Sequence, residues 1–171
     1  MSAITIDDLA NFDLLKGLTK SERLYVGSKL KEKKYPAGKA IFKEGDPGGE
    51  IFFLFKGEVE ISQALTLSMS KSATYDTRDK SIIRLSGEKG PVFGEVAIFG
   101  NEDARTATVT SLTDCRMGVL LKNDFFEILV TNHELGYKIM LNLTRIVCGR
   151  LIAANKNVLK LTTALSLILE N

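Results

Sequence analysis

The spacing of apolar and polar positions changes twice along this chain of 171 residues. Residues 7–32 have helical spacing, and Thr19 and Glu22 stand three apart, as in a capping box at the start of a helix. The apolar face of this region would consist of Leu14, Leu15, Leu18, Leu24 and Leu30. We therefore expect a helical segment ahead of the first strand.

Short β-type runs separated by glycine turns occupy the chain from residue 35 to about residue 121. The candidate strands are residues 40–42, 51–55, 59–69, 82–85, 107–109 and 117–121. Many short strands at this spacing predict an all-β sandwich or barrel. The polar residues 71–80 interrupt the pattern. We interpret them as a solvated hairpin tip, and a partner-binding flap is the alternative.

From residue 122 onward the period is helical again. Seven apolar positions alternate in steps of four and three: Val147, Leu151, Ala154, Val158, Leu161, Leu165 and Ile168. This is the pattern of a coiled-coil seam. The helix could pack along its own barrel, but the seam is longer than one barrel would cover, which favours a homodimer. Residues 161–169 carry no charge, so we expect a twin subunit or another protein to bury them.

The segment 93–109 holds the candidate chemistry. Gly94 lets the backbone approach a ligand closely because it has no Cβ. Glu95 can accept a hydrogen bond from a sugar hydroxyl, and residues 96–98 can form a helical turn whose N–H groups point at an anion. Arg105 supplies a planar guanidinium that matches two phosphate oxygens. The combination suits a small anionic ligand that also carries a hydroxyl.

A second motif lies upstream: Gly45-Asp46-Pro47-Gly48, then Ile51-Phe52-Phe53-Leu54, then Gly57. The two motifs together resemble the cyclic nucleotide-binding domains of catabolite-activator-type regulators, cyclic-nucleotide-dependent kinases and gated channels. The resemblance runs from about Phe12 to Asn155. Phe42 departs from it, because that family usually has a smaller aliphatic residue or cysteine at this position.

The resemblance implies a mainly β fold with helices. Residues 1–132 would form N-terminal helices and a double-stranded β-helix (jelly-roll) barrel, and residues 133–171 a long C-terminal capping or dimerisation helix. It also implies a site for cyclic AMP or cyclic GMP, in which Arg105 pairs with the cyclic phosphate and Glu95 holds the ribose 2′-hydroxyl. The other pocket residues would be Gly94, Val96, Ala97, Thr106 and Ala107. Thr106 is compatible with either nucleotide, so the choice between them stays open.

A rival interpretation is an interaction or scaffold protein with the same fold and a degenerate pocket. Ala104 stands where the family commonly carries proline, and Glu102 and Asp103 would repel an anion near Arg105. In such a pocket Glu95 and Arg105 would simply pair with each other, or Arg105 with Glu102 or Asp103. A third possibility is a regulatory subunit of an enzyme encoded elsewhere.

Composition and charge restrict the remaining classes. The net charge is +2, and the basic run at residues 29–34 is interpreted as the solvated end of a helix rather than a nucleic-acid patch. The N-terminus lacks the features of a secretory signal, and no uncharged apolar run reaches the roughly 20 residues of a membrane span. Cys115 and Cys148 are interpreted as two buried, reduced thiols in a cytoplasmic protein.

Enzyme and DNA-binding classes find no support among the motifs. His133 is the single histidine and is expected where the C-terminal helix begins, so no multi-histidine metal site can form. No P-loop or nucleophile elbow is present, and we expect no catalytic residues, no metal and no cofactor. The residues after Asn155 continue the helix, which leaves no room for a helix-turn-helix. We therefore expect a signal-transduction regulator that senses a cyclic nucleotide and couples it to the C-terminal helix.

Overall fold

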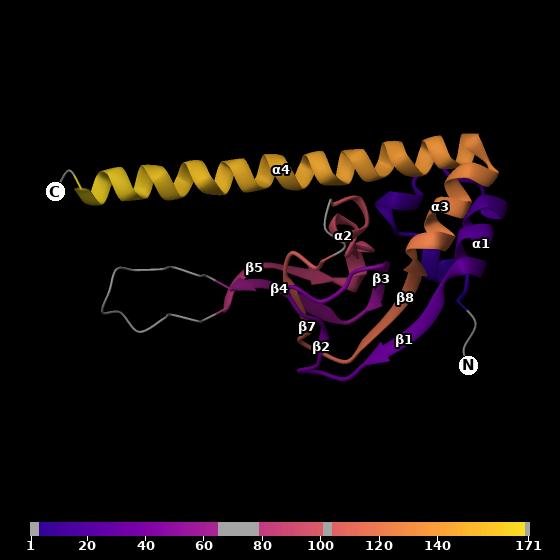
Figure 1. The fold of residues 1–171 in the computed structure, drawn as a ribbon, viewed down its shortest axis with the longest axis horizontal. Helices are drawn as coiled ribbons and strands as arrows, with labels where there is room; N and C mark the ends of the chain where they lie inside the picture. The colour runs from indigo at the N-terminus through magenta and orange to yellow at the C-terminus, as the bar shows by residue number, and fades with distance from the viewer. Residues whose placement is uncertain (1–3, 65–78, 101–103, 170–171) are drawn as a thin grey trace.

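The computed structural model describes residues 4–64, 79–100 and 104–169. Within these residues, two four-stranded antiparallel sheets form a barrel, short helices close one end of it, and a long helix runs past it (Figure 1). The expected jelly-roll barrel with N-terminal helices and a long C-terminal helix is confirmed. Residues 65–69 of one predicted strand and residues 71–78 of the polar excursion lie outside the described residues.

The N-terminal segment is divided into three short helices instead of a continuous one: η1 (Asp7–Leu9), η2 (Asp13–Leu15) and α1 (Lys20–Lys29). The predicted capping box is present, because Thr19 Oγ1 accepts from the Glu22 N–H at 3.2 Å and the Thr19 N–H donates to Glu22 Oε2 at 2.6 Å. Four of the five predicted core leucines are buried, but Leu24 is 46% exposed. The placement of Leu24 on the apolar face was wrong, because α1 presents that side to solvent.

The first sheet has the order β1 (Lys31–Tyr35), β8 (Cys115–Leu121), β3 (Glu50–Lys56) and β6 (Val92–Phe93). The second has the order β2 (Ala40–Phe42), β7 (Thr108–Ser111), β4 (Glu58–Ala64) and β5 (Asp79–Ser86). A short helix, η3 (Gly87–Lys89), follows β5. Every pairing within each sheet is antiparallel.

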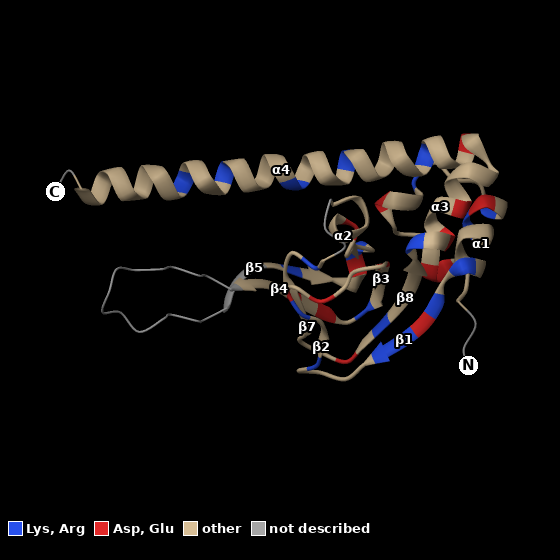
Figure 2. Ribbon diagram, viewed as in Figure 1, with Lys and Arg blue, Asp and Glu red and all other residues tan. Residues whose placement is uncertain are grey.

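The basic run at residues 29–34 was assigned to the end of a helix, which is right for Lys29, the last residue of α1, and wrong for residues 31–34. These residues form most of β1, an edge strand that pairs with β8 from Lys31↔Val119 to Tyr35↔Cys115. Its lysines give that edge a row of charge, visible in Figure 2, and such charges discourage pairing with another sheet. The strand was not recognised in the sequence because residues 31–34 are all charged and so lack the alternation of apolar and polar residues that marks a strand.

The core has two parts that meet at β3. Phe52, Leu54 and Val119 of the first sheet pack with Val59 and Val109 of the second. The alternate β3 residues, Ile51 and Phe53, pack instead against the helices. Because both faces of β3 are buried, its residues form a continuous apolar run and do not alternate between apolar and polar.

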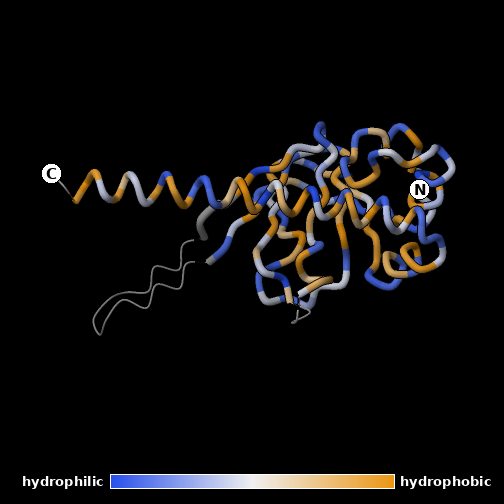
Figure 3. The backbone as a smooth tube through the Cα atoms, turned by 90° about the horizontal axis from the view of Figure 1, so that it is seen from above, coloured by the Kyte–Doolittle hydropathy of each residue, from blue (hydrophilic) through white to orange (hydrophobic). Residues whose placement is uncertain are grey.

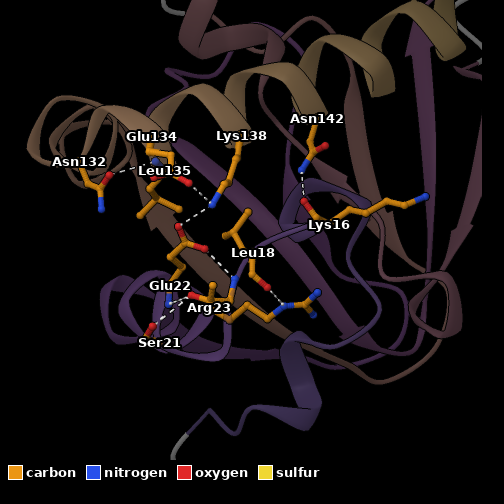
Figure 4. A network of polar contacts seen from close by, with 11 residues as sticks. Lys16, Leu18, Ser21, Glu22, Arg23, Asn132, Glu134, Leu135, Lys138 and Asn142 are labelled. Carbon is orange, nitrogen blue, oxygen red and sulfur yellow. Dashed lines mark hydrogen bonds and ion pairs between the residues drawn. The ribbon is translucent and has the colours of Figure 1, made fainter.

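Helix α3 (Lys122–Thr131) leads into α4 (His133–Leu169), which begins at the residue expected from the sequence. The Asn132 side chain accepts the Leu135 N–H at 3.1 Å and so caps α4. One turn further, Lys138 forms ion pairs with Glu22 of α1 at 3.0 Å and with Glu134 at 2.8 Å (Figure 4).

Asn142 fixes the first half of α4 to the N-terminal segment. Asn142 is 5% exposed, and its amide donates to the carbonyl oxygen of Leu14 at 3.1 Å. It also donates to the carbonyl oxygen of Lys16 at 2.7 Å, the bond drawn in Figure 4. These bonds satisfy carbonyl groups at the end of η2. Together with Lys138, Asn142 ties α4 to both η2 and α1.

The second half of α4 extends away from the barrel (Figure 3). Every described residue from Leu151 to Leu169 is exposed, including the seam residues Leu161 at 71% and Ile168 at 72%. At about 1.5 Å per residue the whole helix is about 55 Å long. Packing along its own barrel, one of the two interpretations of the seam, is therefore wrong for this half of α4.

The two cysteines differ from expectation in one respect. Cys115 is buried and reduced, as predicted, whereas Cys148 is also reduced but exposed on α4. None of the described helices combines the length and apolar character needed to cross a membrane.

The Asn142 contact leads to a first prediction. Asn142→Ala should lower the free energy of unfolding by about 1–3 kcal/mol, because it leaves two nearby carbonyl groups without their donor. Thr144→Ala, two residues along the same helix, removes only a bond to the Met140 carbonyl and should cost less than about 0.5 kcal/mol. Urea unfolding followed by circular dichroism measures both. Equal effects of the two substitutions would show that Asn142 does not hold α4 to η2.

Candidate ligand site

All seven site residues predicted from the sequence line one pocket of about 100 Å³. They are Gly94, Glu95, Val96, Ala97, Arg105, Thr106 and Ala107. The other lining residues are Phe42, Ile61, Phe93, Val109 and Arg150. The pocket lies between the second sheet, the short helix α2 (Val96–Phe99) and α4. The helical turn expected at residues 96–98 is thus present. That these residues bind a ligand stays a prediction.

Two glycines allow the walls of this pocket to approach each other. Gly94 has φ +87°, and a Cβ added there would lie 2.8 Å from the Glu50 carbonyl oxygen and 2.9 Å from Arg105 Nη1. A Cβ on Gly48 would lie 2.5 Å from the Ala97 Cβ. A larger residue at either position would push the loop before α2 or the arginine out of place.

The Arg105 backbone is fixed by the upstream glycine turn. Its N–H donates to the Asp46 carbonyl at 2.8 Å, and its carbonyl accepts the Gly45 N–H at 2.8 Å. Ala104 forms an isolated β-bridge with Pro47. The two sequence motifs therefore meet in space, and the upstream motif positions the arginine of the downstream one.

The Arg105 side chain is 2% exposed and heavily bonded. Nη1 donates to the carbonyl oxygens of Glu50 at 3.0 Å and Gly94 at 3.1 Å, and Nη2 donates to Glu50 Oε2 at 2.5 Å. The Phe42 ring lies over the guanidinium, with its centroid 4.2 Å from Cζ. Arg105 is therefore held from three sides before any ligand arrives.

Burial lowers the pKa of Arg105, and the Glu50 carboxylate opposes that effect. The guanidinium remains charged at neutral pH, because arginine loses its proton only far above it. Within the described residues, Arg105 Nε is buried and has no hydrogen-bond partner. The site thus holds a buried positive charge with one unused donor.

Glu95 is 2% exposed and does not pair with Arg105. Its Oε1 accepts a hydrogen bond from Nη1 of Arg150, which projects from α4, and Nη2 of Arg150 donates to the Val92 carbonyl. The other carboxylate oxygen, Oε2, is buried without a partner among the described residues. The alternative in which Glu95 and Arg105 neutralise each other is therefore wrong.

The remaining sequence-based expectations concern the loop between α2 and Arg105. Thr106 is exposed at the rim of the pocket, where it stays available to a ligand. Glu102 and Asp103, expected to weaken anion binding, lie outside the described residues. Among the described residues, the carboxylate that pairs with Arg105 is that of Glu50.

Three residues of the site were missed as functional candidates. Glu50 pairs with Arg105, Arg150 pairs with Glu95, and the Phe42 ring covers the Arg105 guanidinium. The sequence gives a weak indication that Arg150 has a special role, because this charged residue stands between the apolar seam positions Val147 and Leu151. No sequence pattern indicates a role for Glu50, since its partner Arg105 is 55 residues away along the chain.

A second, mainly apolar pocket of about 420 Å³ lies on the other side of α2, against α4. Its lining residues include Val96, Phe99, Met140, Leu143 and Val147. Glu95 and Val96 border both pockets, so α2 is the wall between them. A movement of α2 would change the space on both sides.

Comparison with known proteins identifies relatives of this chain. The cyclic nucleotide-binding domain family model matches residues 32–132. The cAMP-dependent protein kinase regulatory subunit of Neurospora crassa is 35% identical over 121 residues, which are 71% of this chain and 28% of that protein. A cGMP-dependent protein kinase of Drosophila melanogaster, isozyme 2, is 31% identical over 118 residues, 69% of this chain and 9% of that protein. The chain therefore spans less than a third of these relatives.

The fold has a counterpart among solved structures. The catabolite activator protein of Thermus thermophilus matches with a TM-score of 0.71 and 24% identity, over 88% of this chain and 63% of that one. The family model covers more than half of this chain, and both motifs that suggested the resemblance lie within the matched region. The chain belongs to the cyclic nucleotide-binding domain family.

Proposed function

We propose that the pocket around Arg105 and Glu95 binds a cyclic nucleotide, cyclic AMP or cyclic GMP, and that the protein is a regulatory module without catalytic activity. The observation that carries the proposal is the buried guanidinium of Arg105, which lines the pocket and keeps its Nε–H unpaired. A buried positive charge with an unused donor suits an anion better than a neutral ligand.

The bonds already made by Arg105 leave one edge for a phosphate. Nη1 gives its hydrogens to two carbonyl oxygens, and Nη2 gives one to Glu50. The unpaired Nε–H lies on the edge that Nε shares with Nη2, and this edge of a guanidinium matches two phosphate oxygens. Glu50 therefore does not need to leave when an anion binds.

Glu95 supports the sugar part of the proposal in the same way. Oε1 is engaged by Arg150, and Oε2 remains as an acceptor for a ribose hydroxyl. The two free atoms, a donor on Arg105 and an acceptor on Glu95, belong to the same pocket. A cyclic nucleotide offers an anionic phosphate and a neighbouring hydroxyl on one rigid sugar.

Arg150 is the proposed connection between ligand and helix. It joins α4 to Glu95 and to the Val92 carbonyl, and it stands next to the seam residue Leu151. A hydroxyl that binds Glu95 shares the carboxylate with Arg150. Ligand binding then shifts the balance between positions of α4, as a population shift requires.

The seam of α4 is proposed to bind a second copy of this chain. From residue 151 to 169 the charged residues are Lys156 and Lys160, and neither stands on the seam. The flanking positions Asn155, Asn157 and Thr162 are uncharged, so two identical helices would meet without like-charge repulsion. A symmetric pair would bury a stripe that is exposed in the single chain.

One observation favours the rival function, an interaction protein with a degenerate pocket. Both guanidinium groups of the site already have a carboxylate partner, and the pocket of about 100 Å³ is small for a nucleotide. In that case the fold would act only through α4. Measured affinities separate the two functions.

Isothermal titration calorimetry with cyclic AMP and cyclic GMP tests the site. Wild type should bind at least one of them, and Arg105→Lys should bind at least about 100-fold more weakly, because lysine keeps the charge but loses the two-pronged contact. Arg84→Lys, an exposed arginine on β5, is the matched control and should bind like wild type. Absence of binding by folded wild type would favour the rival function.

Coupling through Arg150 can be followed with a fluorophore on Cys148. A thiol reagent should label Cys148 selectively, because Cys148 is exposed while Cys115 is buried and burial raises the pKa of its thiol. Saturating ligand should change the fluorescence of wild type. The affinity of Arg150→Gln for the nucleotide should stay within about tenfold of wild type, but most of the ligand-induced fluorescence change should be lost. An unaltered response in Arg150→Gln would remove Arg150 from the coupling.

The homodimer is tested by light scattering after size-exclusion chromatography. Wild type should have the mass of two chains, and Leu161→Asp should shift it toward one, because the new charge lies in the apolar seam. Thr163→Asp introduces the same residue outside the seam and should leave the dimer intact. A monomeric wild type, or a Leu161→Asp variant that remains dimeric, would contradict the proposed interface.

A further inference from the structure

We infer that Phe42 is a gate on the ligand pocket, and that its ring must leave Arg105 before a cyclic nucleotide can bind. The inference rests on the proposed function of the pocket. Phe42 belongs neither to the two ion pairs of the site nor to the loop before Arg105. A variant with a smaller residue at position 42 is expected to bind the ligand more tightly.

The first step is the size of the pocket. Its volume is about 100 Å³, whereas pockets for small organic ligands usually measure about 300–1,000 Å³. A nucleotide would therefore overfill this space unless a lining side chain moved or part of the ligand stayed outside it. Phe93 and Val109 are each 1% exposed and belong to the core between the two sheets, so they form a fixed wall.

The second step is the position of the Phe42 ring. It lies over the guanidinium of Arg105, 4.2 Å from its centroid to Cζ. It also contacts the rings of Phe52 at 5.5 Å and Phe93 at 6.2 Å, centroid to centroid. The ring therefore covers one face of the group that would hold the phosphate, and it lines the pocket.

The third step is the freedom of Phe42 to move. It is half-buried, whereas Phe52 and Phe93 are 3% and 1% exposed. It ends β2, a strand of three residues at the edge of its sheet, and the register with β7 shifts between Ala40 and Phe42. Of these three aromatic rings, that of Phe42 is the one that can swing outward without opening the core.

The fourth step compares Phe42 with Arg150, the other large side chain at the pocket. Moving Arg150 breaks its bonds to Glu95 and to the Val92 carbonyl. Moving the Phe42 ring breaks no hydrogen bond, but it costs the ring contacts, the packing against the core and the cation–π interaction. The ring is therefore the cheaper of the two to displace.

The test compares Phe42→Leu with wild type, and Phe42→Tyr as the variant that keeps the ring. If the ring must leave Arg105, leucine should raise the affinity for cyclic AMP or cyclic GMP by about 2- to 30-fold, the factor that corresponds to a cation–π contact. Association, measured by stopped flow with a nucleotide labelled on its base, should also become faster. Phe42→Tyr should remain within about twofold of wild type.

Three outcomes are possible for these measurements. Tighter and faster binding by Phe42→Leu supports the gate. Weaker or unchanged binding overturns it, and weaker binding would identify the ring as part of the platform for the ligand. If neither wild type nor Phe42→Leu binds, the proposed function fails and the gate fails with it. Thermal melts, with Phe42→Met as a second small variant, show that each protein is folded.

Discussion

The buried guanidinium of Arg105 is the constraint on which the site depends. Removing a charge from water is costly, and the chain recovers that cost only by placing acceptors around the charge. Glu50 at the start of β3 and the Gly94 carbonyl supply them, while the turn at Gly45 and Asp46 fixes the backbone. Those contacts require the turn, β3 and the segment before α2 to meet at one point, and the absence of Cβ atoms at residues 48 and 94 permits it. The geometry of the site is therefore set by a charge, and the two sheets provide its support.

Two guanidinium–carboxylate pairs join the site to two different parts of the molecule. Arg105 and Glu50 both belong to the barrel, so their pair holds the barrel side of the pocket. Arg150 comes from α4, so its pair with Glu95 joins the helix to the barrel. The first half of α4 is tied down by Asn142 and Lys138, whereas every described residue beyond Leu151 is exposed. Arg150 lies where these halves meet, so under the proposed coupling it is the residue through which a change at the pocket would reach the exposed half.

Local features were predictable from the sequence, and partners were not. The capping box at Thr19, the helical turn after Glu95 and the start of α4 at His133 depend on neighbouring residues, and all three are present. β1 and β6 were missed, because β1 shows no apolar alternation and β6 has only two residues. Glu50 and Arg150 were missed for a different reason. Each pairs across 55 residues, and a charged side chain in sequence looks the same whether it faces solvent or a buried partner.

The two unpaired atoms of the pocket weigh against a purely structural role. Arg105 Nε and Glu95 Oε2 are both buried and both lack a partner among the described residues. Each such atom costs about 1–3 kcal/mol unless a water or a ligand reaches it, so a ligand that bonded to both would recover that free energy. Arg105 pairs with Glu50 and Glu95 pairs with Arg150, while the Arg105 Nε donor and the Glu95 Oε2 acceptor stay unpaired within the described part of the chain. That pattern, in which the charges are satisfied and one bond on each remains open, is what a site for an anionic ligand with a hydroxyl requires.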